Sequence, residues 1–166
     1  DDVEDFSKCL ARVAKDGRWG YINAKGEQII ECQFDYLYSF SEGLVGVMKD
    51  GKWGYINAKG EQVIECEFDY AENFSEGLAA VRKDNKWGYI NLKNEVVIPI
   101  EFTNRGVSSF KNGVAKYYTD SGIGLINMKG EIIAEPKYNS IEYIKENVAI
   151  VLFDDYYYLY DFRRKE

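Results

Sequence analysis

Short segments in which apolar residues alternate with polar or small ones run along most of this chain, and turn residues separate them. Leu78–Lys83 and Gln62–Phe68 are two such segments. Alternation with a period of two residues is typical of half-buried strands, and no sustained apolar period of 3.6 residues indicates a helix. Asp50-Gly51 suits a two-residue hairpin, and Asn-Ala-Lys-Gly suits a type I turn followed by a glycine bulge. The pattern therefore predicts hairpins of short strands.

One unit of three such strands repeats along the chain. Asp16–Val47 and Asp50–Val81 are identical at 24 of 32 positions, and tryptophan recurs at intervals of 34 residues. Two further copies are degenerate, and the last of them is incomplete. The five registers start near Phe6, Phe40, Phe74, Phe110 and Ile144. We therefore expect residues 1–166 to form a single repeat domain.

A three-stranded meander of this size cannot bury a core by itself, so the units must stack on one another. We expect an all-β fold in which five tandem three-stranded β-meander repeats of about 34 residues form an open solenoid-like stack. Units that add their strands to one continuous sheet would give an extended molecule. A small closed β-propeller is the alternative, but a unit of 34 residues is short for a four-stranded blade.

The unit resembles the WG (KWG) repeat found in many bacterial proteins. Trp-Gly followed by Tyr-Ile-Asn carries this resemblance in three copies, at Trp19, Trp53 and Trp87. The similarity extends from Phe6 to about Arg164 and departs at Ile123-Gly124 and Tyr157-Tyr158, where tryptophan is absent. The resemblance implies a β-rich repeat module with no enzymatic activity and with poorly defined partners.

Composition excludes several kinds of chemistry. The chain has no histidine, which removes Ser–His and Cys–His catalysis and histidine metal ligands. The net charge of −7 disfavours nucleic acid or an anionic membrane as a partner and favours a basic protein surface. Three cysteines without a CxxC pair (Cys9, Cys32 and Cys66) indicate neither a disulfide framework nor a zinc knuckle. This odd count slightly favours the cytoplasm, and export stays open if a signal peptide was trimmed.

The repeated residues are expected to serve the fold. Trp53 and Tyr55 should face one way and Gly54 the other, where the missing side chain would let a neighbouring repeat press onto the backbone. A carboxylate recurs in each hairpin turn, at Asp16, Asp50, Asp84, Asp120 and Asp154. One carboxylate per turn is a poor calcium site, and aspartate suits the turn itself. Glu31, Glu65 and Glu135 recur without a partner group, so we expect no catalytic residue, metal or cofactor.

Positions that vary between copies are the candidates for binding. Five of them carry residue types that anchor interfaces, namely Tyr36, Tyr38, Arg105, Tyr118 and Tyr143. Arg105 also lies in the only lengthened return loop. We expect a non-enzymatic protein-interaction module whose protein partner is unidentified. A weaker similarity to choline- and glucan-binding cell-wall repeats gives polysaccharide binding as the alternative, and the acidic charge gives an immunity-type inhibitor of a basic toxin.

The segment Phe153–Tyr160 is dense in aromatic residues. It forms either a buried terminal strand pair or an exposed edge that attracts other strands. If the five variable residues do not contact a partner, this C-terminal edge is the next candidate surface.

Overall fold

The computed structural model describes residues 3–7, 10–103, 105–145 and 148–161. Within these ranges every regular element is a β-strand, and all strand pairs are antiparallel. The strands form five separate sheets, each in sequence order. The described residues include no helix that is long and apolar enough to span a membrane.

The first sheet contains β1 (Val3–Ser7), β2 (Leu10–Lys15), β3 (Arg18–Asn23) and β4 (Gln28–Phe34). The second contains β5 (Tyr36–Leu37), β6 (Leu44–Lys49), β7 (Lys52–Asn57) and β8 (Gln62–Phe68). The third contains β9 (Tyr70–Ala71), β10 (Leu78–Lys83), β11 (Lys86–Asn91) and β12 (Val96–Phe102). The fourth contains β13 (Gly106–Val107), β14 (Val114–Thr119), β15 (Gly122–Asn127) and β16 (Ile132–Tyr138), and the fifth β17 (Ser140–Lys145), β18 (Val148–Phe153) and β19 (Tyr156–Asp161).

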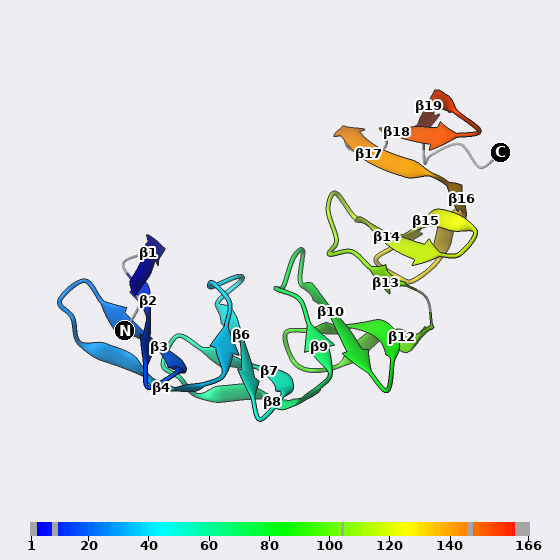
Figure 1. Ribbon diagram of the computed structural model, residues 1–166. Coiled ribbons are helices and arrows are strands. Elements are labelled where there is room, and N and C mark those ends of the chain that lie inside the picture. Colours follow the sequence, from blue (N-terminus) through cyan, green and yellow to red (C-terminus); the bar gives the residue numbers. More distant parts are fainter. Residues whose placement is uncertain (1–2, 8–9, 104, 146–147, 162–166) are drawn as a thin grey trace.

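The five sheets follow one another along an open arc (Figure 1). The first strands, such as β9, β13 and β17, lie on the inner side of the arc, and the last strands, such as β8, β12 and β16, lie on its outer side. The all-β repeat fold is confirmed, and the described strands close no barrel. The units do not join into one continuous sheet, because each pairs only its own strands and covers the next with its face.

One detail differs from the expected unit. The return segments after β4, β8 and β12 each contain a two-residue strand that pairs with the next hairpin, as β5 does with β6, whereas the segment after β16 forms the six-residue β17. The second residue of each two-residue strand is buried, at Leu37, Ala71 and Val107. The second, third and fourth sheets therefore have four strands, of which the inner one is very short.

The turns form as their residues indicate. Asp50 and Gly51 both have positive φ, at 52° and 76°, which is the geometry of a type I′ hairpin. In the next turn, between β7 and β8, the side-chain oxygen of Asn57 accepts hydrogen bonds from the N–H groups of Lys59 and Glu61, at 2.9 and 3.0 Å. Asp50 and the aspartates at the same register of the other units, which we considered as calcium ligands, are thus residues of the hairpin turns.

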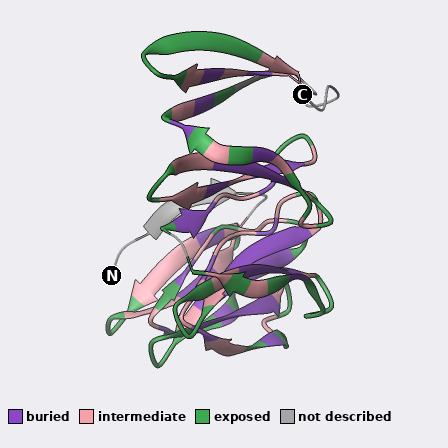
Figure 2. Cartoon of the chain, turned by 90° about the vertical axis from the view of Figure 1, so that its right-hand side faces the viewer, coloured by how far each residue is buried: buried purple, intermediate pink, exposed green. Residues whose placement is uncertain are grey.

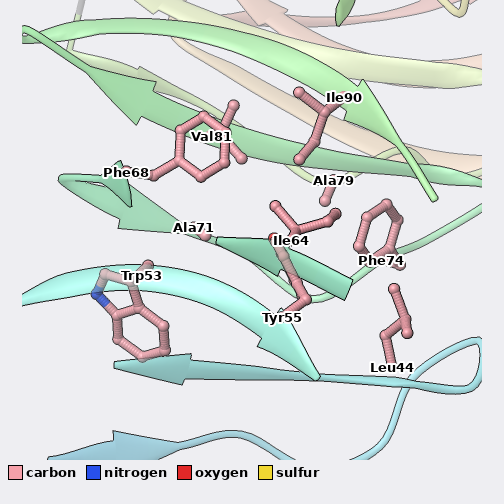
Figure 3. Packing of buried hydrophobic residues seen from close by; sticks show 10 residues of the cluster. All are labelled: Leu44, Trp53, Tyr55, Ile64, Phe68, Ala71, Phe74, Ala79, Val81 and Ile90. Carbon is pink, nitrogen blue, oxygen red and sulfur yellow. The ribbon is translucent and has the colours of Figure 1, made fainter. Parts of the chain in front are cut away.

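The core lies between consecutive sheets. Figure 3 shows Trp53, Tyr55, Ile64 and Phe68 of the second sheet packing toward Ala79, Val81 and Ile90 of the third. Three similar clusters join the other neighbouring sheets. The tyrosine of each Trp-Gly-Tyr segment also donates a hydrogen bond to a carbonyl of the following unit, as Tyr55 does to Glu72 at 2.6 Å. Each unit therefore completes its core only when the next unit covers it.

A Ser-Glu-Gly sequence links the inner sides of neighbouring units. The hydroxyl of Ser41 donates to the carbonyl of Phe74 at 2.6 Å, and the carboxylate of Glu42 accepts from the N–H of Gly77 at 3.0 Å. One unit later, Ser75 and Glu76 make the equivalent bonds to the fourth unit. These bonds fix the spacing of the second, third and fourth sheets on the inner side.

The glycine of the Trp-Gly pair makes room for a strand of its own sheet. A Cβ atom on Gly54 would lie 2.5 Å from the carbonyl oxygen of Ile64, and one on Gly20 would lie 2.4 Å from that of Ile30. In both sheets the outer strand carries a bulge opposite this glycine. The expectation that a neighbouring repeat presses onto Gly54 is therefore wrong, because the close atoms belong to β8 of the same sheet.

Candidate interaction surface

The variable residues singled out in the sequence gather near the inner strands of three sheets. Tyr36 lies on β5 and Tyr38 follows it, Arg105 precedes β13, and Tyr118 on β14 pairs with Gly106 of β13. Tyr143 lies on β17 and pairs with Ala149, and its side chain is outside the described residues. The structure thus places the candidates on the inner half of the arc but divides them among the second, fourth and fifth sheets.

Tyr36 and Tyr38 have different surroundings although they are two residues apart. Tyr36 is 40% exposed, and its ring meets the ring of Trp53 edge-on at 5.9 Å. Tyr38 is half-buried and stacks on Trp53 with ring centres 4.5 Å apart. Burial raises the pKa of Tyr38 well above the usual value of a phenol, and its hydrogen bond to the hydroxyl of Tyr70 adds to this rise. Tyr36 is thus the accessible ring of the pair.

These two tyrosines begin an aromatic row that crosses from the second sheet to the third. The row consists of Tyr36, Tyr38, Trp53, Tyr70 and Trp87. The guanidinium of Arg82 lies 5.7 Å from the centre of the Trp87 ring, within the range of a cation–π contact. Among the described residues, the buried Nε of Arg82 has no hydrogen-bond partner.

Tyr70 and Arg82 were missed in the sequence analysis as members of this surface. Their positions in the repeat could have identified them. Tyr36 pairs with Met48 across β5 and β6. One unit later, Tyr70 pairs with Arg82 across β9 and β10. The same two registers in successive units therefore carry the exposed and half-buried side chains of the inner edge.

The candidates on the fourth sheet are less enclosed. The Nε of Arg105 lies 3.1 Å from a carboxylate oxygen of Asp120, and both side chains are largely exposed. An exposed ion pair of this kind contributes little to stability, so Arg105 is available to a partner. Tyr118 is half-buried, and burial raises the pKa of its hydroxyl.

A pocket of about 280 Å³ opens beside the fifth sheet. Its lining comes from β16, β18 and β19 and consists of Lys137, Tyr138, Val151, Phe153, Tyr158, Leu159 and Tyr160. The ammonium group of Lys137 lies 5.5 Å from the ring centres of both Tyr138 and Phe153. This surface is apolar and aromatic, with one positive charge at its rim.

The recurring glutamates, and likewise the described cysteines, are spread over different sheets. Glu31, Glu65 and Glu135 are exposed on the outer strands of three different sheets. Cys32 and Cys66 are free and half-buried, and burial raises the pKa of the Cys66 thiol; Cys9 lies outside the described residues. The part of the chain that the structure describes contains no group of three or more metal-ligating residues.

Comparison with known families supports the repeat assignment. A family model described as "WG containing repeat" matches the chain four times, at residues 19–53, 53–87, 87–120 and 123–157. The fourth match starts at Ile123, in a copy without tryptophan. No curated protein matches the chain.

Several solved structures share the fold at low sequence identity. Hsv2p of Kluyveromyces lactis is 11% identical with a TM-score of 0.61, covering 96% of this chain and 61% of that one. A variant, KlHsv2 with loop 6CD replaced by a Gly-Ser linker, gives 12% identity, a TM-score of 0.60 and coverages of 96% and 63%. A eukaryotic initiation factor is 8% identical with a TM-score of 0.63, and the match covers 96% of this chain and 50% of that one. The chain thus spans half to two thirds of these proteins, and the likeness supports a propeller-like order of sheets.

Proposed function

The chain belongs to the family of WG-containing repeats, and on this premise we propose that it is a non-enzymatic protein-interaction module. Its contact surface is the inner side of the arc, from the aromatic row to Arg105. The observation that carries the proposal is the position of the variable anchor residues. They lie on the inner strands and beside them, whereas the repeated residues fill the interfaces between sheets.

The partner that fits this surface is a protein with a basic patch. The chain carries a net charge of −7, which attracts positive surfaces and repels nucleic acid and anionic membranes. Tyr36 supplies an accessible aromatic ring, and Arg105 supplies a polar anchor on the fourth sheet. Aromatic and arginine side chains of this kind are the usual energetic centres of protein interfaces.

Polysaccharide binding is the weaker candidate. Sugar rings stack on the open face of an aromatic side chain, but Trp53 is only 6% exposed and one face of its ring is covered by Tyr38. The inhibition of a basic toxin would use the same inner surface, and its support is the acidic charge alone.

Capture experiments test the proposal. The immobilised chain is used to isolate partners, and one purified partner is then titrated with wild-type protein and with Tyr36→Ala/Arg105→Ala. We expect the double variant to bind at least about 30-fold more weakly, which corresponds to about 2 kcal/mol. Val63→Ala, on the outer strand β8, is the matched control and should bind as wild type. Unchanged binding by the double variant would refute this surface, and binding on a glycan array alone would favour the polysaccharide alternative.

A further inference from the structure

The fifth sheet has an outer edge that no described strand covers. In the other four sheets a long outer strand covers the third strand, as β8 covers β7, whereas the fifth sheet ends at β19. The two-residue turn at Asp154-Asp155 makes Phe153 and Tyr156 the first hydrogen-bonded pair. Hydrogen-bonded and non-bonded pairs then alternate, so the N–H and C=O groups of Tyr157 and Leu159 point away from β18.

The side chain of Tyr158 excludes the type of strand that covers this edge elsewhere. Tyr158 stands at the register of Gly20, Gly54 and Gly88. At those glycines the bulged outer strand comes within 2.7 Å of the place where a Cβ would lie. A tyrosine there leaves no room for the bulge, so only a regular strand fits along β19.

The same strand is the most exposed apolar element of the described chain. Tyr157 and Leu159 are 74% and 73% exposed, whereas the equivalent Trp53 and Tyr55 of the second sheet are 6% and 0% exposed. Figure 2 shows most of β19 in green at the top of the view, whereas the strands below it carry many purple segments. An apolar and unpaired edge of this kind is a site for pairing with another strand.

We propose that β19 pairs edge-to-edge with β19 of a second copy of this chain. Two identical strands in antiparallel order form a self-complementary contact about a two-fold axis. The backbone N–H and C=O groups of Tyr157 and Leu159 both point away from β18. A two-fold axis at Leu159 therefore sets Leu159 opposite Leu159 of the second copy, where these groups can form hydrogen bonds between the two strands. Two three-stranded sheets then become one sheet of six strands, in which the free edge of each β19 is paired.

The charges around β19 favour the antiparallel order. Asp154 and Asp155 precede the strand, and in the sequence Arg163 and Arg164, which lie outside the described residues, follow it. With the axis at Leu159, antiparallel order sets the acidic turn of one copy against the C-terminal end of β19 in the other, from which the sequence continues into the two arginines. Parallel order would instead bring like charges together. The net charge of −7 on each copy opposes association, so the measurement needs a moderate salt concentration.

Sedimentation equilibrium and light scattering of the whole chain test the proposal. Because a six-residue edge gives a small interface, the protein is examined from about 5 to 200 μM in about 150 mM salt. The weight-average mass should rise from 19.2 kDa to about twice that value and then stop rising. Leu159→Lys and Leu159→Glu each place like charges opposite each other at the axis, and each should raise the dissociation constant about tenfold or more.

The decisive arm is an equimolar mixture of the two variants. Lysine now faces glutamate across the axis, so the mixture should recover the mass of the dimer. Ile132→Lys, which charges an exposed position on β16, is the control and should associate as wild type. A monomeric wild type, a dimer that Leu159→Lys does not weaken, or a mixture that stays monomeric would overturn the proposal. Masses that keep rising beyond the dimer would also overturn it, since they indicate head-to-tail stacking of sheet faces. Binding of a partner to the inner surface is measured separately on Leu159→Lys, so the two proposals fail independently.

Discussion

Replacing Gly54 by alanine tests why the glycine of the Trp-Gly pair is needed. The added Cβ would lie 2.5 Å from the carbonyl oxygen of Ile64 and 2.7 Å from backbone atoms of Glu65 and Cys66. Ordinary contacts begin near 3.4 Å, so the β8 bulge must move by almost 1 Å. Such backbone shifts cost about 1–3 kcal/mol, and the close atoms are backbone, which puts Gly54→Ala at the upper end. The lower entropy of the unfolded alanine chain returns only about 0.4–1 kcal/mol.

The expected net loss is about 2 kcal/mol in the free energy of unfolding, measured by urea denaturation followed by tryptophan fluorescence. For a chain of this length, the melting temperature should fall by about 4–8 °C. Amide exchange should rise first in β8, because the opened bulge belongs to that strand.

Gly124 provides the matched control. There a Cβ would meet the ring of Tyr117 at 2.3 Å, so the nearest obstacle is a side chain. The units before it carry valine at the register of Tyr117, and Tyr117→Val should therefore rescue Gly124→Ala in a double-mutant cycle. The facing valine in the second sheet is Val47, and Val47→Ala should not rescue Gly54→Ala. Rescue by Val47→Ala, or a Gly54→Ala protein as stable as wild type, would refute the role of the β8 backbone.

Three further predictions concern aromatic residues. Trp53→Ala should lower the free energy of unfolding by about 3–5 kcal/mol and the half-buried Trp19→Ala by less, as measured in urea. Tyr38→Ala should cost about 1–3 kcal/mol because it loses the stack on Trp53, whereas Tyr36→Ala should stay within about 1 kcal/mol of wild type in the same assay. Burial raises the pKa of Tyr21 and Tyr117 to about 12, so their protonated forms stabilise the fold fully below about pH 10. That contribution should be lost between about pH 10 and 12, as followed by phenolate absorbance together with circular dichroism; a urea midpoint that is constant from pH 9 to 12 would contradict it.

The strands and turns of the unit could be predicted because local chemistry determines them. The alternation in Leu78–Lys83 predicts a strand, although residues 78–81 of it are buried on both faces. Asp50-Gly51 specifies a hairpin that needs positive φ at both positions. The inner strands could not be predicted in this way, because β5, β9 and β13 have two residues each and no alternation to detect. Their pairing depends on the next hairpin, which offers a free edge at the right distance.

The candidate surface was predicted only in outline for a related reason. Tyr36 and Tyr38 look equivalent in the sequence, yet Gly46 makes room for the ring of Tyr38, whose Cδ2 lies 2.8 Å from where a Cβ on Gly46 would be. In the next unit the same two registers hold Glu72 and Ala80. The tyrosine and the glycine thus change together, to glutamate and alanine. Because the two positions lie on different segments, a comparison of one position at a time does not reveal that they depend on each other.

The two degenerate units show how the Trp-Gly pair depends on its surroundings. In the fourth unit Ile123 replaces tryptophan at the register that forms the aromatic row, and the ring of Tyr117 covers Gly124 from the neighbouring strand. In the fifth unit no described outer strand needs room, and Tyr158 replaces the glycine. Residues are thus held constant where a strand or a neighbouring sheet presses on them. The side chains of Tyr36, Arg105 and most of β19 are exposed, so packing within the described chain does not determine which residues stand there.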